Sequence, residues 1–169
     1  MEVAVQNTFP WYALKVRTGS EPVAVRALSF RGYQPFAPMV QERRRYSDRI
    51  KHAEKAVFPG YVFCRFDTRN KKPILSSLAV ENIVAFGGVY ARIPDEEIAG
   101  IQKAVLAGAV PAPYVSIGKQ VKVVRGPLTG VRGVVVRQSG RDTFVVSVEL
   151  LQRSVGLEIE TDSLAPVVT

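Results

Sequence analysis

Ten consecutive residues in the first half of the chain carry its densest positive charge. Residues 43–52 hold four arginines and one lysine against a single aspartate. Arginine and lysine attract phosphates regardless of base sequence, so such a cluster indicates a surface for nucleic acid. A solvated, charged hairpin is an equally good interpretation. The candidates for phosphate contact are Arg43, Arg44, Arg45, Arg49 and Lys51, then Arg69, Lys71 and Lys72, with Arg26 and Arg31 as a further extension.

The segment that follows, residues 57–67, concentrates aromatic side chains. It is Val-Phe-Pro-Gly-Tyr-Val-Phe-Cys-Arg-Phe-Asp and holds four of the fourteen Phe and Tyr residues of the chain. Strand residues alternate between two faces, so about half of these rings must pack in the core. The others are expected to stay exposed for a partner. Pro59-Gly60 predicts a bend or the start of a strand.

No group of residues in the sequence indicates catalysis. His52 is the only histidine, which excludes a histidine-rich metal site, and the chain lacks a glycine-rich phosphate loop with its lysine. Cys64 is the only cysteine, so no internal disulfide can form, and its apolar strand context predicts a core residue. We therefore expect a protein that is not an enzyme and uses no cofactor or metal.

Length and composition indicate a soluble globular protein. The chain has 169 residues, 47% of them hydrophobic, and a formal net charge of +8. No run approaches the ~20 apolar residues of a membrane span, and residues 1–10 lack the pattern of a secretory signal. We expect a cytoplasmic monomer without membrane contact. Residues 1–110 hold 16 basic and 10 acidic side chains, so this part contributes most of the positive charge.

The first part of the chain predicts an α+β domain with a ferredoxin-like β-α-β-β-α-β order and an extra terminal helix. Ser20 is expected to cap the first helix and Gly32 to end it in a left-handed conformation. Helices are expected from Ser20 to Gly32, over residues 71–78 as a short piece, and from Pro94 onward. Strands are expected over residues 11–16, 36–46, 57–66 and 82–86.

The second part of the chain predicts a small SH3-like antiparallel β-barrel, because short strands alternate with turns that mostly contain glycine. The expected domains are residues 1–108 and 115–169, joined by an extended, proline-containing linker over 109–114. The expected barrel strands are residues 121–124, 131–137, 143–150 and 155–159.

Residues 121–135 resemble the KOW motif. They are Val-Lys-Val-Val-Arg-Gly-Pro-Leu-Thr-Gly-Val-Arg-Gly-Val-Val, with Gly126, Pro127, Gly130 and Gly133 in the places that the motif expects. Gly126-Pro127 should make a turn, and the later glycines should permit a tight reversal into the next strand. Each glycine taken alone is better explained by the shape of a barrel than by contact with a ligand.

Motifs in the first half of the chain indicate which family with a KOW motif this sequence resembles. Trp11-Tyr12, the helix that begins at Ser20, Phe36-Ala37-Pro38-Met39 and Phe58-Pro59-Gly60-Tyr61-Val62-Phe63 together resemble the N-terminal (NGN) domain of the NusG family. With the KOW motif, the resemblance covers nearly the whole chain. The Ala-Pro-Met stretch and the divergent hairpin are more similar to specialised RfaH-like and UpxY-type antiterminators than to the housekeeping factor.

This resemblance implies a transcription elongation and antitermination factor that is not an enzyme. In the family, the open sheet face of the NGN domain binds the clamp helices of the largest RNA polymerase subunit, which opposes pausing and termination. The basic hairpin would contact upstream or non-template DNA. Lys15 departs from the aromatic residue that RfaH carries at its position. The positions that match the polymerase-binding face are Lys15, Phe36, Phe58, Pro59, Tyr61 and Ile98.

The resemblance also implies a partner for the barrel. In the housekeeping family, an aromatic residue before the last strand helps to bind termination factor Rho or a ribosomal protein. Leu151 replaces that residue here and Arg153 follows it, which argues against Rho and leaves the ribosome as the expected partner. In RfaH the second domain can instead fold as a helical hairpin. The valine-rich strands and glycines of this chain favour a stable barrel.

Two functions from different classes fit the sequence. The first is the NusG-like factor for RNA polymerase. The second is a KOW-type RNA-binding or ribosome-associated structural protein, because the KOW motif also occurs in ribosomal proteins. Binding to core polymerase that is lost on substitution of Tyr61 or Phe58 would separate the first from the second.

Overall fold

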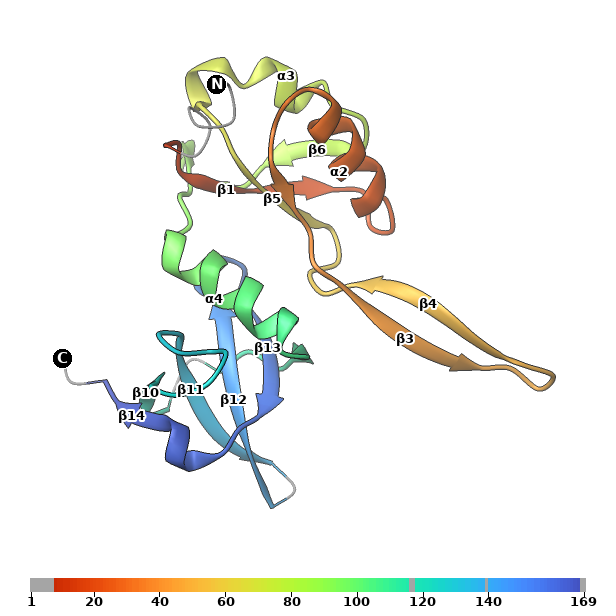
Figure 1. Ribbon diagram of the computed structural model, residues 1–169. Helices are drawn as coiled ribbons and strands as arrows, with labels where there is room; N and C mark the ends of the chain where they lie inside the picture. Colours follow the sequence, from red (N-terminus) through yellow and green to blue (C-terminus); the bar gives the residue numbers. More distant parts are fainter. Residues whose placement is uncertain (1–7, 116–117, 139, 168–169) are drawn as a thin grey trace. The chain divides into compact units, whose positions relative to one another are not determined.

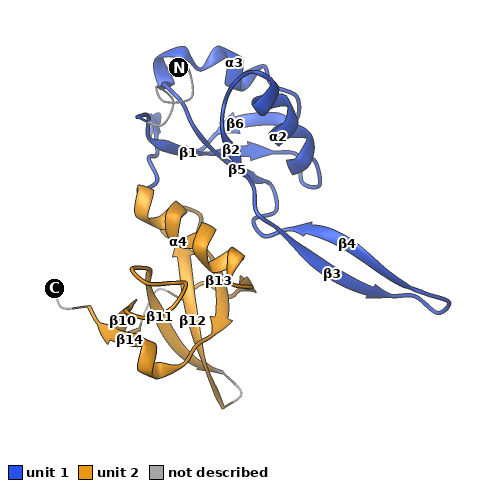
Figure 2. Cartoon of the chain, in the orientation of Figure 1, with its two compact units in different colours: residues 1–93 blue, residues 94–169 orange. Residues whose placement is uncertain are grey.

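The chain divides into two units between Ile93 and Pro94 (Figure 2). The computed structural model describes residues 8–115, 118–138 and 140–167. We expected a boundary after residue 108 and a linker over 109–114. Instead, helix α4 (Asp95–Leu106) groups with unit 2, and Val110–Ala112 form strand β9, which pairs with β13 (Arg153–Glu158). Proline is tolerated in β9 because this strand lies at the edge of its sheet.

Unit 1 contains the predicted ferredoxin-like order of strands and helices. Its elements are β1 (Trp11–Val16), α2 (Glu21–Phe30), β2 (Pro35–Phe36), β3 (Met39–Arg45), β4 (Ile50–Ala56), β5 (Tyr61–Arg65), η1 (Thr68–Asn70), α3 (Lys72–Leu75), β6 (Val80–Ile83), β7 (Ala85–Phe86) and β8 (Val89–Tyr90). The main sheet has the antiparallel order β2-β5-β1-β6, and α2 and α3 cover one of its faces (Figure 1). Strands β3 and β4 form a separate two-stranded sheet.

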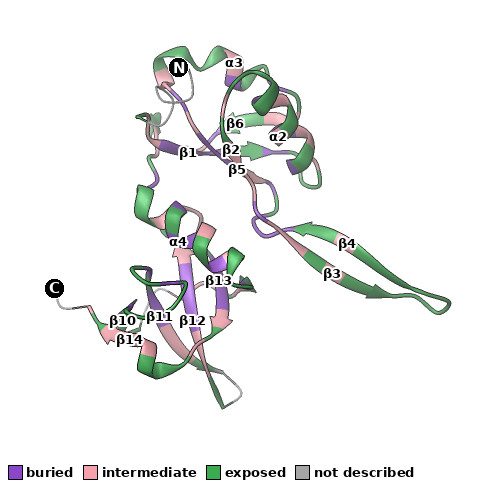
Figure 3. Ribbon diagram, in the orientation of Figure 1, coloured by how far each residue is buried: buried purple, intermediate pink, exposed green. Residues whose placement is uncertain are grey.

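Alternation along β1 gives the sheet of unit 1 two different faces. Tyr12, Leu14 and Val16 pack with α2 and α3 in a buried apolar core. Fully burying an aliphatic side chain such as Leu28 of α2 contributes about 1.5–3 kcal/mol. The opposite face carries Trp11, Ala13 and Lys15, of which Trp11 and Ala13 are buried, and the paired positions of β5 are Arg65, the buried Phe63 and Tyr61. Figure 3 shows buried strands in this sheet and a largely exposed β3–β4 pair.

Helix α2 begins differently from the expectation. Ser20 occupies the N-cap position, but its side chain makes no capping hydrogen bond among the described residues. The next side chain, Glu21, is buried and accepts a hydrogen bond from the backbone N–H of Gly60 at 2.7 Å. Gly32 follows the helix with a φ of +87°, as predicted. The start of α2 is therefore tied to the aromatic segment rather than closed by its own cap.

Unit 2 is an antiparallel six-stranded sheet with helix α4 packed on it, and it fits the barrel-like domain that we predicted. Its remaining elements are β10 (Gln120–Val123), β11 (Arg132–Gln138), β12 (Arg141–Val148), η2 (Glu149–Leu151), η3 (Thr161–Ser163) and β14 (Leu164–Pro166). The strand order is β14-β10-β11-β12-β13-β9, so the sequence predicted the four central strands and missed β9 and β14. A side chain at Gly100 of α4 would approach Val146 to 3.3 Å, which shows how closely the helix lies on β12. No helix among the described residues is long and apolar enough to cross a membrane.

Candidate nucleic-acid and partner surfaces

The basic residues around position 45 lie on a two-stranded ribbon, β3–β4, which we call the basic ribbon (residues 39–56). Seven cross-strand pairs run from Met39 opposite Ala56 to Arg45 opposite Ile50. The backbone N–H of Tyr46 donates to the carbonyl of Arg49 at 2.8 Å and closes the tip. All residues from 43 to 52 are exposed. The ribbon therefore holds its cations in solvent on a defined backbone.

Like charges stand opposite each other on this ribbon. Arg44 pairs with Lys51 across the strands. Directly opposed like charges destabilise an antiparallel pair, so stability of the ribbon does not explain this choice of residues. The described ion pair within the ribbon joins Arg44 to Glu42 at 3.2 Å, and both are substantially exposed. The arrangement favours an external polyanion over internal pairing.

The other predicted cations lie on the η1–α3 segment (residues 68–75), where internal partners occupy several of them. Arg69 forms a forked ion pair with Asp67, with contacts of 2.8 and 3.1 Å, and its hydrogen bonds hold the pKa of Asp67 below the usual value. Lys71 donates to the hydroxyl of Tyr90 at 2.9 Å. Arg31, which follows α2, donates to Ser76 and to the carbonyl of Pro73, both at 2.7 Å. Lys72 and Arg26 are exposed.

The aromatic rings of the sheet's second face form a layered cluster. Phe63 stacks with Phe36 at 6.0 Å between centroids and meets Phe58 edge-on at 5.3 Å. Phe58 and Phe63 are buried, whereas Phe36 and Tyr61 are half-buried, and Pro59 is exposed. Our expectation of an uncovered aromatic face is therefore not met at Phe58, which is only 1% exposed. Phe58 lies in the turn before β5, where strand alternation does not apply.

Two predicted polymerase-binding residues, Lys15 and Ile98, lie in different units. Lys15 is exposed on β1 and is directly opposite Tyr61 of β5, so these two side chains share a face. Ile98 is on α4 in unit 2 and is 1% exposed. The structure brings Lys15, Phe36, Pro59 and Tyr61 onto one unit, with Phe58 below them.

The Pro59-Gly60 turn fixes the start of the aromatic strand. Gly60 has a φ of +84°, a conformation that favours glycine. Its N–H donates to Glu21 and its carbonyl accepts from the N–H of Val16 at 2.9 Å. Both backbone groups of this residue are thus used, and they hold Tyr61 at the first position of β5.

Sequence reasoning missed several exposed apolar side chains of unit 1, of which Phe86, Val89 and Phe30 are examples. Phe86 and Val89 flank the Gly87-Gly88 turn of β7–β8 and are 62% and 70% exposed. Phe30, at the last position of α2, is 94% exposed. Phe86 had a usable signal, since an aromatic next to a Gly-Gly turn has little room to be covered. Phe30 had none, because its spacing from Val23 and Ala27 is that of the buried face of a helix.

The KOW glycines have structural roles in the described residues. Gly126 and Gly130 have φ values of +87° and +93° in the β10–β11 turn, where the N–H of Gly130 donates to the carbonyl of Val123 at 2.8 Å. A side chain at Gly133 would lie 2.4 Å from the carbonyl oxygen of Val145 and 2.8 Å from the ring of Phe144. Pro127 is exposed in the same turn. These geometries support the interpretation that the motif shapes the sheet.

The expected partner loop of unit 2 is ordered by a short 3-10 helix, η2. Leu151 ends η2 and is half-buried, and Gln152 follows it with a φ of +49°. Arg153 is exposed at the first position of β13. The loop therefore offers a cation beside a partly covered leucine.

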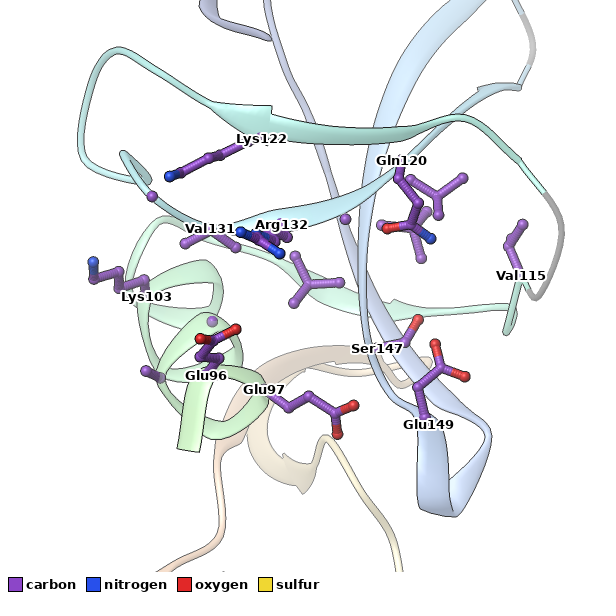
Figure 4. Close-up of a pocket in the computed structure, with 17 residues that line it drawn as sticks. Glu96, Glu97, Lys103, Val115, Gln120, Lys122, Val131, Arg132, Ser147 and Glu149 are labelled. Atoms are coloured by element: carbon purple, nitrogen blue, oxygen red, sulfur yellow. The ribbon is translucent and has the colours of Figure 1, made fainter. Parts of the chain in front are cut away.

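A cavity of about 410 Å³ lies between α4 and strands β10 to β12 of unit 2 (Figure 4). Lys103 and Lys122 lie at one side of it and Glu97, Ser147 and Glu149 at the other. Burial raises the pKa of Glu97, and the nearby Glu149 carboxylate adds to this effect, while a hydrogen bond from the Glu149 backbone opposes it. Oε2 of Glu97 is buried without a hydrogen-bond partner among the described residues.

Cys64 and His52 are the single thiol and the single imidazole of the chain. Burial raises the pKa of Cys64 to about 12, so its reactive thiolate is suppressed. No group of three or more potential metal ligands occurs among the described residues. His52 stands exposed on the basic ribbon.

Comparison with known proteins identifies the family. The model of the family described as transcription termination factor NusG matches residues 9–102, more than half of the chain. The search of curated proteins found no match. Among solved structures, one on the domain interaction of Thermotoga maritima NusG is 20% identical, covers 96% of this chain and 99% of its own, and has a TM-score of 0.49. An MjSpt4:Spt5 complex (conformation B) is 17% identical, covers 94% and 97%, and has a TM-score of 0.34. On the family match, the chain belongs to the NusG family of transcription factors.

Proposed function

We propose that this protein is a transcription elongation and antitermination factor that binds the clamp helices of RNA polymerase through unit 1. Membership of the NusG family supports this proposal. The observation that carries it is the group of half-exposed and exposed side chains on the sheet face away from α2 and α3. The contact residues are Lys15, Phe36, Pro59 and Tyr61.

The contact face has a rigid support beneath it. Phe58 and Phe63 lie under the half-exposed ring of Phe36 and pack edge-on against each other. A helical tip that brings apolar side chains gains most where the receiving rings are already fixed, because no ordering of those rings is then required. In this proposal Phe58 positions the surface, and the buried Ile98 makes no direct contact.

The basic ribbon adds a second contact, to DNA near the polymerase. Its exposed, opposed cations support this role. Unit 2 would recruit the ribosome through the loop with Leu151 and Arg153, without Rho. The divergent ribbon and the Ala-Pro-Met stretch support an operon-selective branch similar to RfaH and UpxY, acting as a cytoplasmic monomer.

The proposal is tested by transcription with core polymerase on a template that carries pause sites and a terminator. The intact protein should shorten pauses and increase terminator read-through. Phe36→Ala should weaken this effect. The protein concentration needed for half-maximal read-through should rise at least tenfold. Phe30→Ala is the matched control, because it removes an exposed phenylalanine from α2. Equal loss in both variants, or no effect of the intact protein, would contradict the proposal.

One observation favours a second function, binding of structured RNA by unit 2. Lys122 of β10 stands directly opposite Arg132 of β11, and both are exposed. Such a like-charge row suits a phosphate backbone. Retention of the intact chain on ribosomal RNA, lost in Lys122→Gln/Arg132→Gln and accompanied by no polymerase binding, would replace the first function with this one.

A further inference from the structure

We propose that a groove on the helical side of unit 1 binds an acidic amphipathic helix of a partner protein. The groove lies between α2 and the segment that follows α3, and its volume is about 510 Å³. Phe30, Leu78, Arg26 and Arg31 are among the residues that line it. The proposed polymerase contact lies on the sheet face that α2 and α3 leave open (Figure 1). The two surfaces are therefore separate, and this inference goes beyond the proposed function.

Helix α2 has two apolar faces, and only one of them is covered. Ala24 and Leu28 pack in the core of unit 1. Val23, Ala27 and Phe30 share a neighbouring face, where Val23 and Ala27 are half-buried and Phe30 is 94% exposed. A surface helix ordinarily has a single apolar stripe, about 100° wide, and a polar remainder. The second apolar face of α2 therefore indicates a partner that covers it.

The opposite side of the groove displays a leucine on a turn with an unusual backbone. The N–H of Val80 donates to the carbonyl of Ser77 at 3.1 Å, which closes a turn with Leu78 and Ala79 at its centre. Ala79 has a φ of +70°, a conformation that glycine usually supplies. Leu78 is 69% exposed on this turn. Backbone strain of this kind clusters at binding sites, which supports a docking role for Leu78.

Two arginines make the groove attractive to carboxylates. Arg26 is exposed and makes no hydrogen bond or ion pair among the described residues. Arg31 uses Nη1 for its bonds to the carbonyl of Pro73 and to Oγ of Ser76, both at 2.7 Å. These bonds fix the guanidinium while Nε and Nη2 stay available for a carboxylate. None of the described residues that line the groove is acidic.

The lining and its charge favour a protein helix over other occupants. A second copy of this chain would bring two pairs of arginines into one small interface without a carboxylate. Single-stranded nucleic acid is bound on several aromatic rings, whereas Phe30 is the only aromatic among the described residues of the lining. A flat lipid surface would leave the hollow between Phe30 and Leu78 unfilled. An amphipathic helix brings apolar anchors for the hollow and carboxylates for the arginines.

The test measures binding of a fluorescent peptide to the full chain. The peptide has about 14 residues, is stapled so that it is helical, and carries leucine at i, i+3, i+4 and i+7 with glutamate at the flanking positions. Its matched control keeps the leucines and replaces each glutamate with lysine. The acidic peptide should bind at least about tenfold more tightly than the basic one. Equal affinities, or no binding of the acidic peptide, would overturn the inference.

Substitutions in the protein locate the binding. Phe30→Ala should weaken binding of the acidic peptide at least about tenfold. Phe86→Ala is the matched control, because it removes another exposed phenylalanine from unit 1, and it should change the affinity less than about twofold. Arg26→Gln should weaken binding about threefold to fivefold, whereas the same change in charge in Arg92→Gln should have an effect below about twofold. Equal losses within either pair of variants would show that the peptide binds elsewhere and would contradict the inference.

Three further measurements test the other occupants. Sedimentation of the full chain reports a second copy, and binding to single-stranded DNA and to anionic lipid vesicles reports the other two. We expect the Phe30→Ala protein to equal the wild type in all three measurements. A loss in any of them that is specific to Phe30→Ala would assign the groove to that occupant and overturn the inference.

Discussion

The basic ribbon and the η1–α3 segment are similar in sequence and different in structure. Both are rich in arginine and lysine, and both were predicted to bind nucleic acid. On the ribbon, cations oppose other cations, as Arg44 opposes Lys51. On the segment, Arg69 is held by Asp67 and Lys71 by Tyr90. The density of basic residues is thus a poor measure of the charge that a partner can reach.

The difference has a local cause in the chain. Asp67 accepts from both the backbone and the side chain of Arg69, two residues later, at the start of η1. In a strand, residues two apart also share a face, but only Glu42 on the ribbon is placed to pair with the following Arg44. Availability of a cation depends on the acidic residue two positions away more than on the number of cations nearby.

The largest expected effect comes from removing three charges from each region in turn. Arg43→Gln/Arg44→Gln/Arg45→Gln should weaken DNA binding about 500-fold at 0.1 M salt, because each of the three phosphate contacts contributes about 0.9 log units there. Arg69→Gln/Lys71→Gln/Lys72→Gln makes the same change in charge and should weaken it less than about fivefold, because two of its three cations, Arg69 and Lys71, are engaged internally. Fluorescence anisotropy with duplex DNA measures both. Equal losses would show that net charge alone, and not pairing, controls binding.

A smaller effect should follow from releasing a paired cation. Asp67→Asn removes the partner of Arg69 and should strengthen DNA binding about twofold to threefold at 0.1 M salt. The matched control is Asp48→Asn, which makes the same change at the exposed tip of the ribbon. If Asp67→Asn leaves affinity unchanged while Asp48→Asn raises it, Arg69 lies outside the DNA surface.

The smallest expected effect concerns a carboxyl group whose situation is the reverse of that of Asp67. Burial raises the pKa of Glu97, so its folded state favours the protonated form. The stability that it contributes is fully present below its ordinary pKa of about 4.5 and is lost as pH rises through the raised value. Glu97→Gln should therefore raise Tm by about 1–3 °C at pH 7 and by less at pH 4. Thermal unfolding at the two pH values measures this, and a gain that is equal at both would contradict the assignment.

Local sequence rules predicted much of the fold. Gly32 ended α2 with a positive φ, and the valine-rich segments between residues 120 and 158 became strands. The rules failed where a tertiary contact decided the outcome. Ser20 makes no capping hydrogen bond among the described residues, and the neighbouring Glu21 instead accepts one from Gly60, 39 residues away. Val110–Ala112 form a strand because they pair with the edge of β13. No local sequence pattern predicts this pairing.

The candidate site shows the same limit. The sequence correctly placed the cations of residues 43–51 on a hairpin, since turn residues and alternating strands are local signals. The sequence did not predict that Phe58 is buried. This residue precedes β5, so the alternation of strand side chains between two faces does not apply to it. The spacing of Ile98 and Ile101 in the sequence indicates one face of a helix, and both residues are buried. The unit that this face joins depends on contacts between distant parts of the chain.

The central claim is that the sheet face with Tyr61 docks RNA polymerase. The most direct measurement is the affinity of the full chain for core RNA polymerase, compared between Tyr61→Ala on β5 and Tyr46→Ala at the tip of the ribbon. Each variant removes one partly exposed tyrosine, and circular dichroism controls for folding. We predict at least a tenfold loss for Tyr61→Ala, as for a central interface aromatic, and less than about twofold for Tyr46→Ala. Wild-type affinity in a folded Tyr61→Ala protein would contradict the account.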